Sequence, residues 1–142
     1  LINSPRLRAE ERKCREKARD ALNFVGLSHA ENHLAGDISQ EERKRVAFAL
    51  ALATNPKVVL LDEPAGGVNP DETVGLAELI RKMVKHGLTV CLIEHKMNMI
   101  MSLADKIMVL NYGEKIAEGT PAEIRANPAV IDAYLGSEHA DA

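Results

Sequence analysis

The spacing of hydrophobic residues changes along this chain from helical to strand-like and back. Between Pro5 and Leu27, apolar residues recur at helical spacing among Arg, Lys and Glu residues, and Gly26 is a stop signal near the end. We therefore expect an exposed amphipathic helix there. A second helix is expected after Ser39, because Ser39 and Glu42 form a Ser-x-x-Glu capping box ahead of an alanine-rich run.

Two short apolar runs without polar alternation follow, Lys57 to Asp62 and Leu88 to Ile93. Such runs are typical of parallel strands that are covered on both faces. Between them, Asp71 to His86 has helical spacing and stops at Gly87, so the three segments predict a right-handed crossover in a parallel sheet. Cys91 lies inside the second run, where we expect a buried small hydrophobe.

The last third of the chain predicts shorter elements. Lys96 to Leu103 is expected to be a helix, and Lys106 to Leu110 a third strand that extends the parallel sheet. Residues 111–113, Asn-Tyr-Gly, predict a turn into a final strand around Lys115 to Ala117. The tail predicts two short helices separated at Pro128. This order of elements defines the α/β class, and we expect one structural unit.

Charge and composition narrow the class of partner and compartment. The 142 residues carry a net charge of −3, and basic residues alternate with acidic ones from Arg6 to Asp20. No basic stripe is offered to a nucleic-acid backbone, so nucleic acid is not an expected partner. The two cysteines, Cys14 and Cys91, lack metal-type spacing, which fits a reducing, cytoplasmic compartment.

No apolar stretch reaches the roughly 18 residues that a membrane-spanning helix needs. The chain begins at Leu1 without an initiator methionine and without the charged start of a secretory signal. We therefore expect a fragment of a longer protein, or a sequence that has been trimmed at its start. The residues alone do not separate these two interpretations.

The candidate chemistry begins with two adjacent carboxylates, Asp62 and Glu63, at the carboxyl end of the first apolar run. Open α/β sheets bind ligands at this place. Neighbouring residues on a strand point in opposite directions, so one carboxylate is suited to hold Mg²⁺ and the other to position a nucleophilic water. The alternative interpretation is an acidic pair at an ordinary strand end.

His95 follows the second apolar run as Glu63 follows the first. Because neighbouring parallel strands end at the same edge, Glu63 and His95 are expected to reach a common ligand. The imidazole is suited to donate a hydrogen bond to a phosphate oxygen, although a structural loop histidine is the alternative. We expect Glu94, beside it, to face solvent or to form a salt bridge.

Two helix starts complete the candidate residues. Ser39 precedes a helix whose positive end is suited to a phosphate, but Glu41 and Glu42 in its first turn repel anions, which favours a plain helix cap. Asn69 is the expected N-cap of the next helix, with Pro70 at its first position.

The order and intervals of these segments resemble the ATP-binding-cassette ATPases. Arg45 to Ala49 and Pro56 to Pro64 have the spacing that links the signature helix to the Walker B strand in that family. Gly66 to Pro70 then falls on the D-loop, and His95 falls on the switch histidine. The resemblance covers roughly Ala18 to Gly136, and it implies a three-layer parallel sheet of the P-loop NTPase type with flanking helices.

The resemblance implies a role for each candidate residue. Asp62 corresponds to the residue that holds Mg²⁺, Glu63 to the catalytic base and His95 to the residue on the γ-phosphate of ATP. Ser39 and Asn69 correspond to residues that contact the nucleotide across an interface between two ATPase domains, whether identical or different. It further implies membrane permease subunits as partners, and a peripheral location on the cytoplasmic face of the plasma (inner) membrane.

Three further segments look like the ATP-binding subunit of branched-chain amino acid importers. They are Ala65 to Pro70, Ile93 to Met97, and the tail from Gly119 to Gly136. The resemblance therefore implies a subunit that hydrolyses ATP to drive amino acid import. It also implies a division of residues 1–142 into a helical and signature part up to residue 54, a core over 55–118 and a helical tail over 119–142.

Two departures from the family pattern qualify this expectation. The family's Leu-Ser-Gly-Gly-Gln signature aligns with Ile38 to Glu42, so Gln40 and Glu41 replace both glycines. The Walker A pattern Gly-x-x-x-x-Gly-Lys-Ser/Thr does not occur in these residues, and no segment before Pro5 supplies a Q-loop. We therefore expect a partial domain that lacks the Walker A half and that binds ATP poorly by itself.

Two other functions are alternatives to an active transport ATPase. A catalytically silent domain that pairs with a competent partner is consistent with the altered signature. A chromosome-maintenance ATPase shares the same motif layout, but it requires long heptad repeats beside the signature, and Arg6 to Val25 is too short for these.

Overall fold

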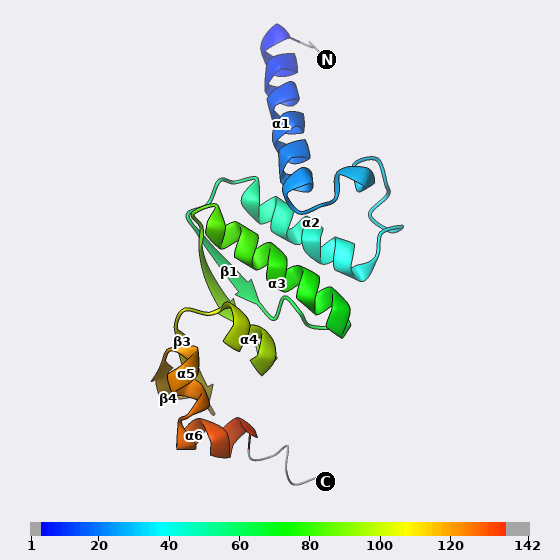
Figure 1. The fold of residues 1–142 in the computed structure, drawn as a ribbon. Helices are drawn as coiled ribbons and strands as arrows, with labels where there is room; N and C mark the ends of the chain where they lie inside the picture. The colour runs from blue at the N-terminus through cyan, green and yellow to red at the C-terminus, as the bar shows by residue number, and fades with distance from the viewer. Residues whose placement is uncertain (1–3, 136–142) are drawn as a thin grey trace. The chain divides into compact units, whose positions relative to one another are not determined.

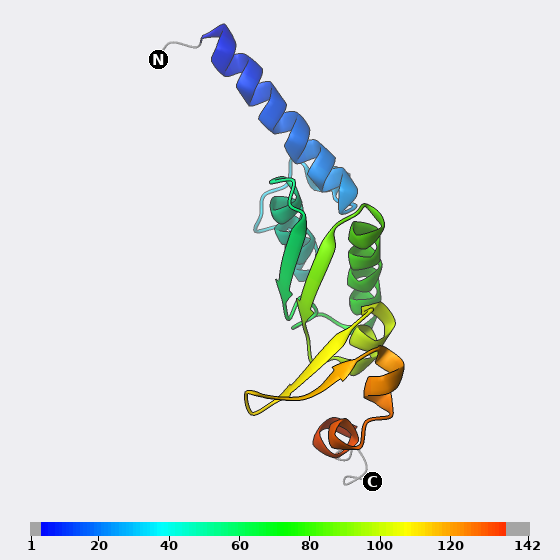
Figure 2. The same cartoon turned by 90° about the vertical axis from the view of Figure 1, so that its left-hand side faces the viewer.

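The computed structural model describes residues 4–135 of the chain (Figures 1 and 2). Its contacts divide the chain into two units, Leu1–Glu94 and His95–Ala142. The first unit contains α1 (Pro5–Phe24), a short 3₁₀ helix (Ser28–Ala30), α2 (Gln40–Leu52), β1 (Val58–Asp62), α3 (Pro70–Lys85) and β2 (Thr89–Ile93). The second contains α4 (Met97–Leu103), β3 (Ile107–Asn111), β4 (Glu114–Gly119), α5 (Pro121–Arg125), α6 (Pro128–Val130) and a π-helical turn (Ile131–Leu135). The expected subdivision at residues 54 and 118 stays a prediction.

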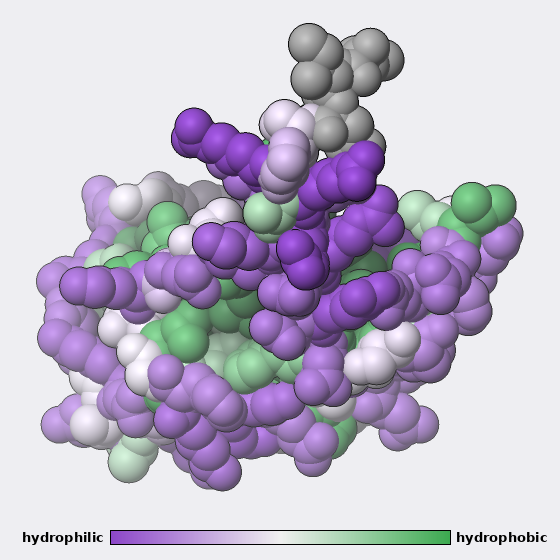
Figure 3. All heavy atoms as spheres, turned by 90° about the horizontal axis from the view of Figure 1, so that it is seen from above, coloured by the Kyte–Doolittle hydropathy of each residue, from purple (hydrophilic) through white to green (hydrophobic). Residues whose placement is uncertain are grey.

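Helix α1 begins and ends where the sequence predicts. The Ser4 hydroxyl accepts a hydrogen bond from the Leu7 amide (3.3 Å), and Gly26 has a φ of 80° just beyond the last turn. Most of the helix carries exposed charged side chains, which contribute to the hydrophilic face seen in Figure 3. At its C-terminal end, Lys82 of α3 donates to the Phe24 carbonyl (2.6 Å). None of the helices within residues 4–135 is long and apolar enough to cross a membrane.

The strands β1 and β2 form the parallel pair that the sequence predicts. Their register runs from Val58 opposite Thr89 to Asp62 opposite Ile93. Helix α3 is the crossover between them and lies along one face of the pair (Figure 2). The buried side chains of that helix are Leu76, Ala77, Leu79, Ile80 and Met83. The α/β class with a parallel sheet is confirmed.

The opposite face of this strand pair is exposed in the part of the chain that the structure describes. Leu60 is 76% exposed and Ile93 is 63% exposed, whereas Val59, which points the other way, is 4% exposed. The expectation that both faces are covered is therefore wrong for these residues, because the first unit leaves the face with Leu60 and Ile93 open to solvent. Cys91 is exposed for the same reason, so its predicted burial is also wrong.

The second unit is built on a β-hairpin. Strands β3 and β4 pair in antiparallel fashion through a turn at Tyr112 and Gly113, whose φ angles of 46° and 84° are typical of tight hairpins. The expectation that this third strand extends the parallel sheet is wrong, because β3 pairs with β4 in a separate two-stranded sheet. The core of the unit consists of Ile107, Val109, Ala117, Ile124 and Val130.

Arg45 joins three segments of the first unit. Its Nη2 lies 2.7 Å from the Glu41 carboxylate within α2, and its Nη1 donates to the Val25 carbonyl (3.1 Å) beyond α1. The same guanidinium passes close to α3 at Gly75, where an added Cβ would lie 2.7 Å from Nη2. Glycine at this position therefore makes room for the arginine.

We expect Gly75→Ala to lower the free energy of unfolding. Alanine normally stabilises a helix interior by about 0.5–1 kcal/mol relative to glycine. Here the methyl group would displace Arg45 from at least one partner, a loss of about 1–3 kcal/mol that outweighs the gain. Urea denaturation measures the difference.

The matched control is the same substitution in an Arg45→Ala background. There the methyl group meets no guanidinium, so Gly75→Ala should stabilise the protein by about 0.5–1 kcal/mol. Stabilisation of similar size in both backgrounds would show that Gly75 has no role in admitting Arg45.

Candidate functional site

Both predicted carboxylates lie at the open end of the parallel strand pair. Asp62 is the last residue of β1, Glu63 follows it, and both are exposed. The ladder continues one residue beyond the strand, because the Glu63 amide donates to the Ile93 carbonyl (2.9 Å). The two acids therefore stand at the strand ends where α/β sheets bind ligands.

Glu63 has an unusual backbone conformation. Its φ of 42° is in the left-handed region, which residues other than glycine seldom adopt. The residue has thus already left the strand, so the alternation of strand side chains does not set the direction of its carboxylate. The expected strand alternation is therefore wrong for Glu63, although its position beside Asp62 is as expected.

The turn that follows Glu63 is held by hydrogen bonds. The Gly66 amide donates to the Glu63 carbonyl (2.9 Å), and the Ala65 amide donates to the Glu94 carboxylate (3.3 Å). From α2, Lys44 Nζ donates to the Pro64 carbonyl (2.7 Å). Lys44 was not among the residues expected at this site, and Glu94, expected to face solvent or form a salt bridge, also accepts a hydrogen bond from a main-chain amide.

Gln40 lies beside Lys44 on the surface of α2 and also faces this turn. Gln40 and Lys44 are four residues apart in α2, so they lie on the same face of the helix. The Gln40 amide group also approaches the loop after β1, since a Cβ added at Gly67 would lie 3.0 Å from Gln40 Nε2. One polar face of α2 thus runs beside the segment from Pro64 to Gly67.

Asn69 caps α3 as the sequence predicts. Its side chain accepts a hydrogen bond from the Glu72 amide (2.9 Å), and the Glu72 carboxylate accepts one from the Asn69 amide (3.0 Å). Pro70 occupies the first helical position. Asn69 is exposed in the part of the chain that the structure describes, so a partner domain can reach it there.

The segment that aligns with the family signature forms a helix cap, and both of its glutamates have bonding partners. The Ser39 hydroxyl accepts from the Glu42 amide (3.1 Å), and the Glu42 carboxylate accepts from the Ser39 amide (2.7 Å) and lies 3.0 Å from His29 Nε2. Glu41 is paired with Arg45, as described above. Both carboxylates therefore have partners within the unit, which reduces the repulsion expected toward an anion near Ser39.

His95 is exposed and begins the second unit. Glu63 belongs to the first. The expected meeting of Glu63 and His95 at one ligand therefore stays a prediction.

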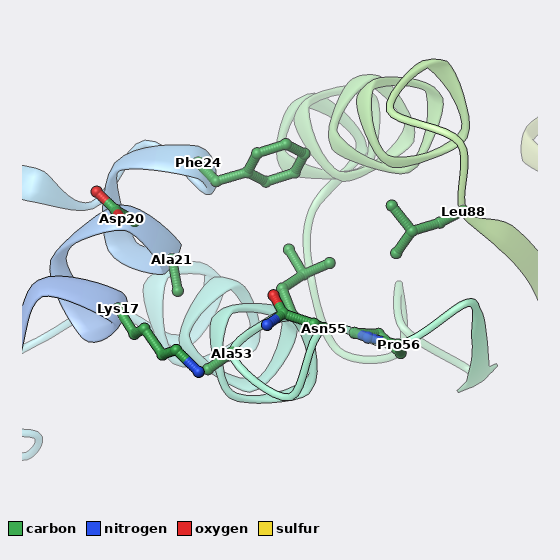
Figure 4. Close-up of a pocket in the computed structure, with 9 residues that line it drawn as sticks. Lys17, Asp20, Ala21, Phe24, Ala53, Asn55, Pro56 and Leu88 are labelled. Atoms are coloured by element: carbon green, nitrogen blue, oxygen red, sulfur yellow. The ribbon is translucent and has the colours of Figure 1, made fainter. Parts of the chain in front are cut away.

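A shallow hollow lies elsewhere in the first unit (Figure 4). Its volume is about 350 Å³, and the walls include Ala21, Phe24 and Leu88, with Lys17 and Asn55 among the polar members. None of the predicted site residues lines it. Its lining is mainly apolar and offers no arrangement suited to phosphate or metal, so the candidate site remains the strand end at Asp62.

The donor set at this strand end fits Mg²⁺ bound together with a nucleotide. Within residues 4–135, no three His, Cys, Asp or Glu side chains are grouped to hold a metal. Magnesium usually takes one or two protein carboxylates and completes its shell with water and phosphate oxygens. An exposed Asp62 at a strand end satisfies that requirement, whereas an all-protein metal cage is not formed by these residues.

The strand ends define the class of protein to which the chain belongs. A parallel β-α-β unit with carboxylates at the end of its first strand belongs to the class of α/β domains that bind ligands, nucleotides among them, at their strand ends. Two family models refine this class. Residues 3–66 match a model described as ABC transporter, and residues 114–140 match one described as branched-chain amino acid ATP-binding cassette transporter.

Curated relatives and solved structures agree with these matches. The chain is 44% identical over 137 residues to the high-affinity branched-chain amino acid transport ATP-binding protein BraF of Pseudomonas aeruginosa, covering 96% of this chain and 54% of the relative. It is 39% identical to LivG of Escherichia coli, with the same coverage. The chain thus spans about half the length of these relatives.

Among solved structures, the ADP conformation of an ATP-binding cassette of an ABC transporter matches with a TM-score of 0.80 and 32% identity, over 87% of this chain and 50% of that one. A nucleotide-free ATP-binding cassette matches with a TM-score of 0.79 and 31% identity, over 86% of this chain and 50% of that one. The chain belongs to the ATP-binding-cassette family.

The Glu42 cap leads to a pH prediction. The hydrogen bond from the Ser39 amide, followed by that from His29, holds the pKa of Glu42 below its ordinary value of 4.5. A lowered pKa in the folded state stabilises the fold above the unfolded-state pKa, and this contribution is lost as the pH falls through the folded-state value. We therefore expect acid to weaken the wild-type fold partly through Glu42.

Glu42→Gln tests this expectation, because glutamine keeps the acceptor of the capping box but does not titrate. Thermal unfolding measured from neutral pH to below the pKa of Glu42 should show a smaller acid-induced decrease in Tm for the variant than for the wild type. Identical profiles for the two proteins would show that the cap does not depend on the Glu42 charge.

Proposed function

We propose that this chain supplies the magnesium-binding and water-activating residues of an ATP-hydrolysing subunit in a branched-chain amino acid importer. The observation that carries the proposal is the placement of Asp62 and Glu63 at the end of β1, directly beyond the capped helix α2. The names of the relatives BraF and LivG, both branched-chain amino acid transport ATP-binding proteins, support the choice of solute.

The two carboxylates would divide the chemistry between them. Asp62 would hold Mg²⁺, which neutralises negative charge on the ATP phosphates when it is bound. Glu63 would accept a hydrogen bond from the attacking water and take up its proton as the water oxygen bonds to the γ-phosphorus and the bond from that phosphorus to the bridging oxygen of ADP breaks, releasing ADP. Its exposure at the sheet edge supports this role, because an ordered water can approach the carboxylate there.

The remaining candidate residues would contact phosphate or a partner domain. His95 would donate a hydrogen bond to the γ-phosphate, whose charge grows during transfer. Ser39 and Asn69 would face the nucleotide of a second ATPase domain, identical or different, in a head-to-tail pair. The exposure of Ser39 and Asn69 supports such contacts.

The phosphate cradle has to come from a segment other than these 142 residues, because they contain no Gly-x-x-x-x-Gly-Lys-Ser/Thr pattern. The subunit would act on the cytoplasmic face of the inner membrane, as a peripheral partner of permease subunits. The altered signature leaves a silent domain as the alternative function. The pairing of Glu41 with Arg45 favours the active one, since the acid is turned toward its own helix.

The proposal predicts the effect of Glu63→Gln in the protein encoded by the native gene, assembled with its partners. ATP turnover should fall on the order of 10²–10⁴-fold, because glutamine does not accept the proton of the attacking water. Binding of a fluorescent ATP analogue should be unchanged, since the substitution is isosteric. Turnover by purified protein and analogue titration give the two quantities.

Glu78→Gln is the matched control, because Glu78 is an exposed carboxylate on α3 away from the strand end. It should keep the wild-type rate. A Glu63→Gln protein that also keeps this rate would overturn the proposed role, and it would identify the chain as a silent domain that depends on a competent partner.

A further inference from the structure

The main chain around Glu63 is more constrained than an exposed loop requires. Glu63 keeps its φ of 42° although it is not a glycine. Residues held in this region usually persist because their surroundings fix them, and they are enriched at functional sites. Pro64 and Ala65, which follow directly, are buried, and Ala65 is 0% exposed. The turn is thus anchored at its base while the Glu63 side chain remains exposed.

Two charged side chains, one from α2 and one just after β2, bind the same peptide group of this turn. Lys44 of α2 donates from Nζ to the Pro64 carbonyl (2.7 Å), and Glu94 accepts at Oε2 from the Ala65 amide (3.3 Å). Lys44 and Glu94 are both partly buried. Hydrogen bonds to charged groups are stronger than neutral ones, particularly where water is partly excluded.

These two contacts involve the carbonyl of one residue and the amide of the next, so they act on the same peptide unit, that between Pro64 and Ala65. That unit is separated from the Glu63 Cα only by the Glu63–Pro64 peptide and the Pro64 Cα, so holding it restricts the movement of the segment that carries the Glu63 side chain. The ladder bond from the Glu63 amide to the Ile93 carbonyl (2.9 Å) fixes the other side of the same residue.

We propose that Lys44 and Glu94 are positioning residues that hold the Pro64–Ala65 peptide and thereby aim the Glu63 carboxylate. The inference rests on the proposed function, in which Glu63 is the base. It adds a connection from α2, the helix capped by Ser39, to the turn that carries this base. A displacement of the signature helix would be transmitted to Glu63 through Lys44.

The proposal predicts a specific kinetic signature for Lys44→Met and Glu94→Ala in the intact native protein. Each should lower kcat on the order of ten- to a hundredfold, because small misplacements of reacting groups reduce turnover this strongly. KM for Mg-ATP should change less than about threefold, since neither side chain is assigned to nucleotide binding. Steady-state ATP turnover provides both constants.

Conservative substitutions separate positioning from a general loss of stability. Lys44→Arg keeps a donor and Glu94→Gln keeps an acceptor, so both should recover most of the wild-type kcat.

Lys57→Met is the matched control, because Lys57 is exposed just before β1, and it should leave kcat unchanged. Thermal melting of each variant shows whether a change in kcat accompanies unfolding. If Lys44→Met does not fold, Glu94→Ala tests the same peptide from the opposite side.

The outcomes distinguish this inference from the proposed function. If Glu63→Gln is inactive while Lys44→Met and Glu94→Ala keep the wild-type kcat, the positioning role is wrong and the role of Glu63 stands. If Glu63→Gln is active, both fail. Loss of kcat in proportion to a lowered Tm, without recovery in Lys44→Arg and Glu94→Gln, would also overturn the positioning role.

Discussion

The parallel pairing of β1 with β2 is the interaction on which the candidate site depends. Its register places Asp62 opposite Ile93, so the two strands end at the same edge of the sheet. Only in this register do the Glu63 amide and the Ile93 carbonyl meet, and only then does Glu94 lie within reach of the Ala65 amide. A slip of one residue would turn every strand side chain to the opposite face and separate these groups.

The features that the sequence predicted correctly are those set by local chemistry. The capping box at Ser39 and the N-cap at Asn69 need only residues close together along the chain, and both are formed. The apolar runs of β1 and β2 and the helical spacing between them likewise predicted the parallel crossover. The place of Asp62 and Glu63 then follows from the rule that ligands bind at the ends of parallel strands.

The features that the sequence did not predict depend on partners distant along the chain. Lys44 and Pro64 are 20 residues apart, and Ala65 and Glu94 are 29 apart, so no periodic pattern relates them. The exposure of Leu60 was not predicted either. Its apolar character favours a covering layer on that face of the strand pair, and the described residues do not supply one. The conformation of Glu63 was also unpredictable, since nothing in its residue type favours a positive φ.

Helix α2 therefore connects two parts of the candidate site. The segment that aligns with the family signature lies at its N-terminal end, and its Lys44 supports the turn after Asp62. The central claim is that this turn has one fixed conformation, and hydrogen exchange at the Ala65 amide in the intact protein tests it most directly. The account predicts exchange as slow as that of the β1 amides, because the Ala65 amide is buried and bonded to Glu94. Exchange as fast as that of the exposed Gly36 amide would contradict it.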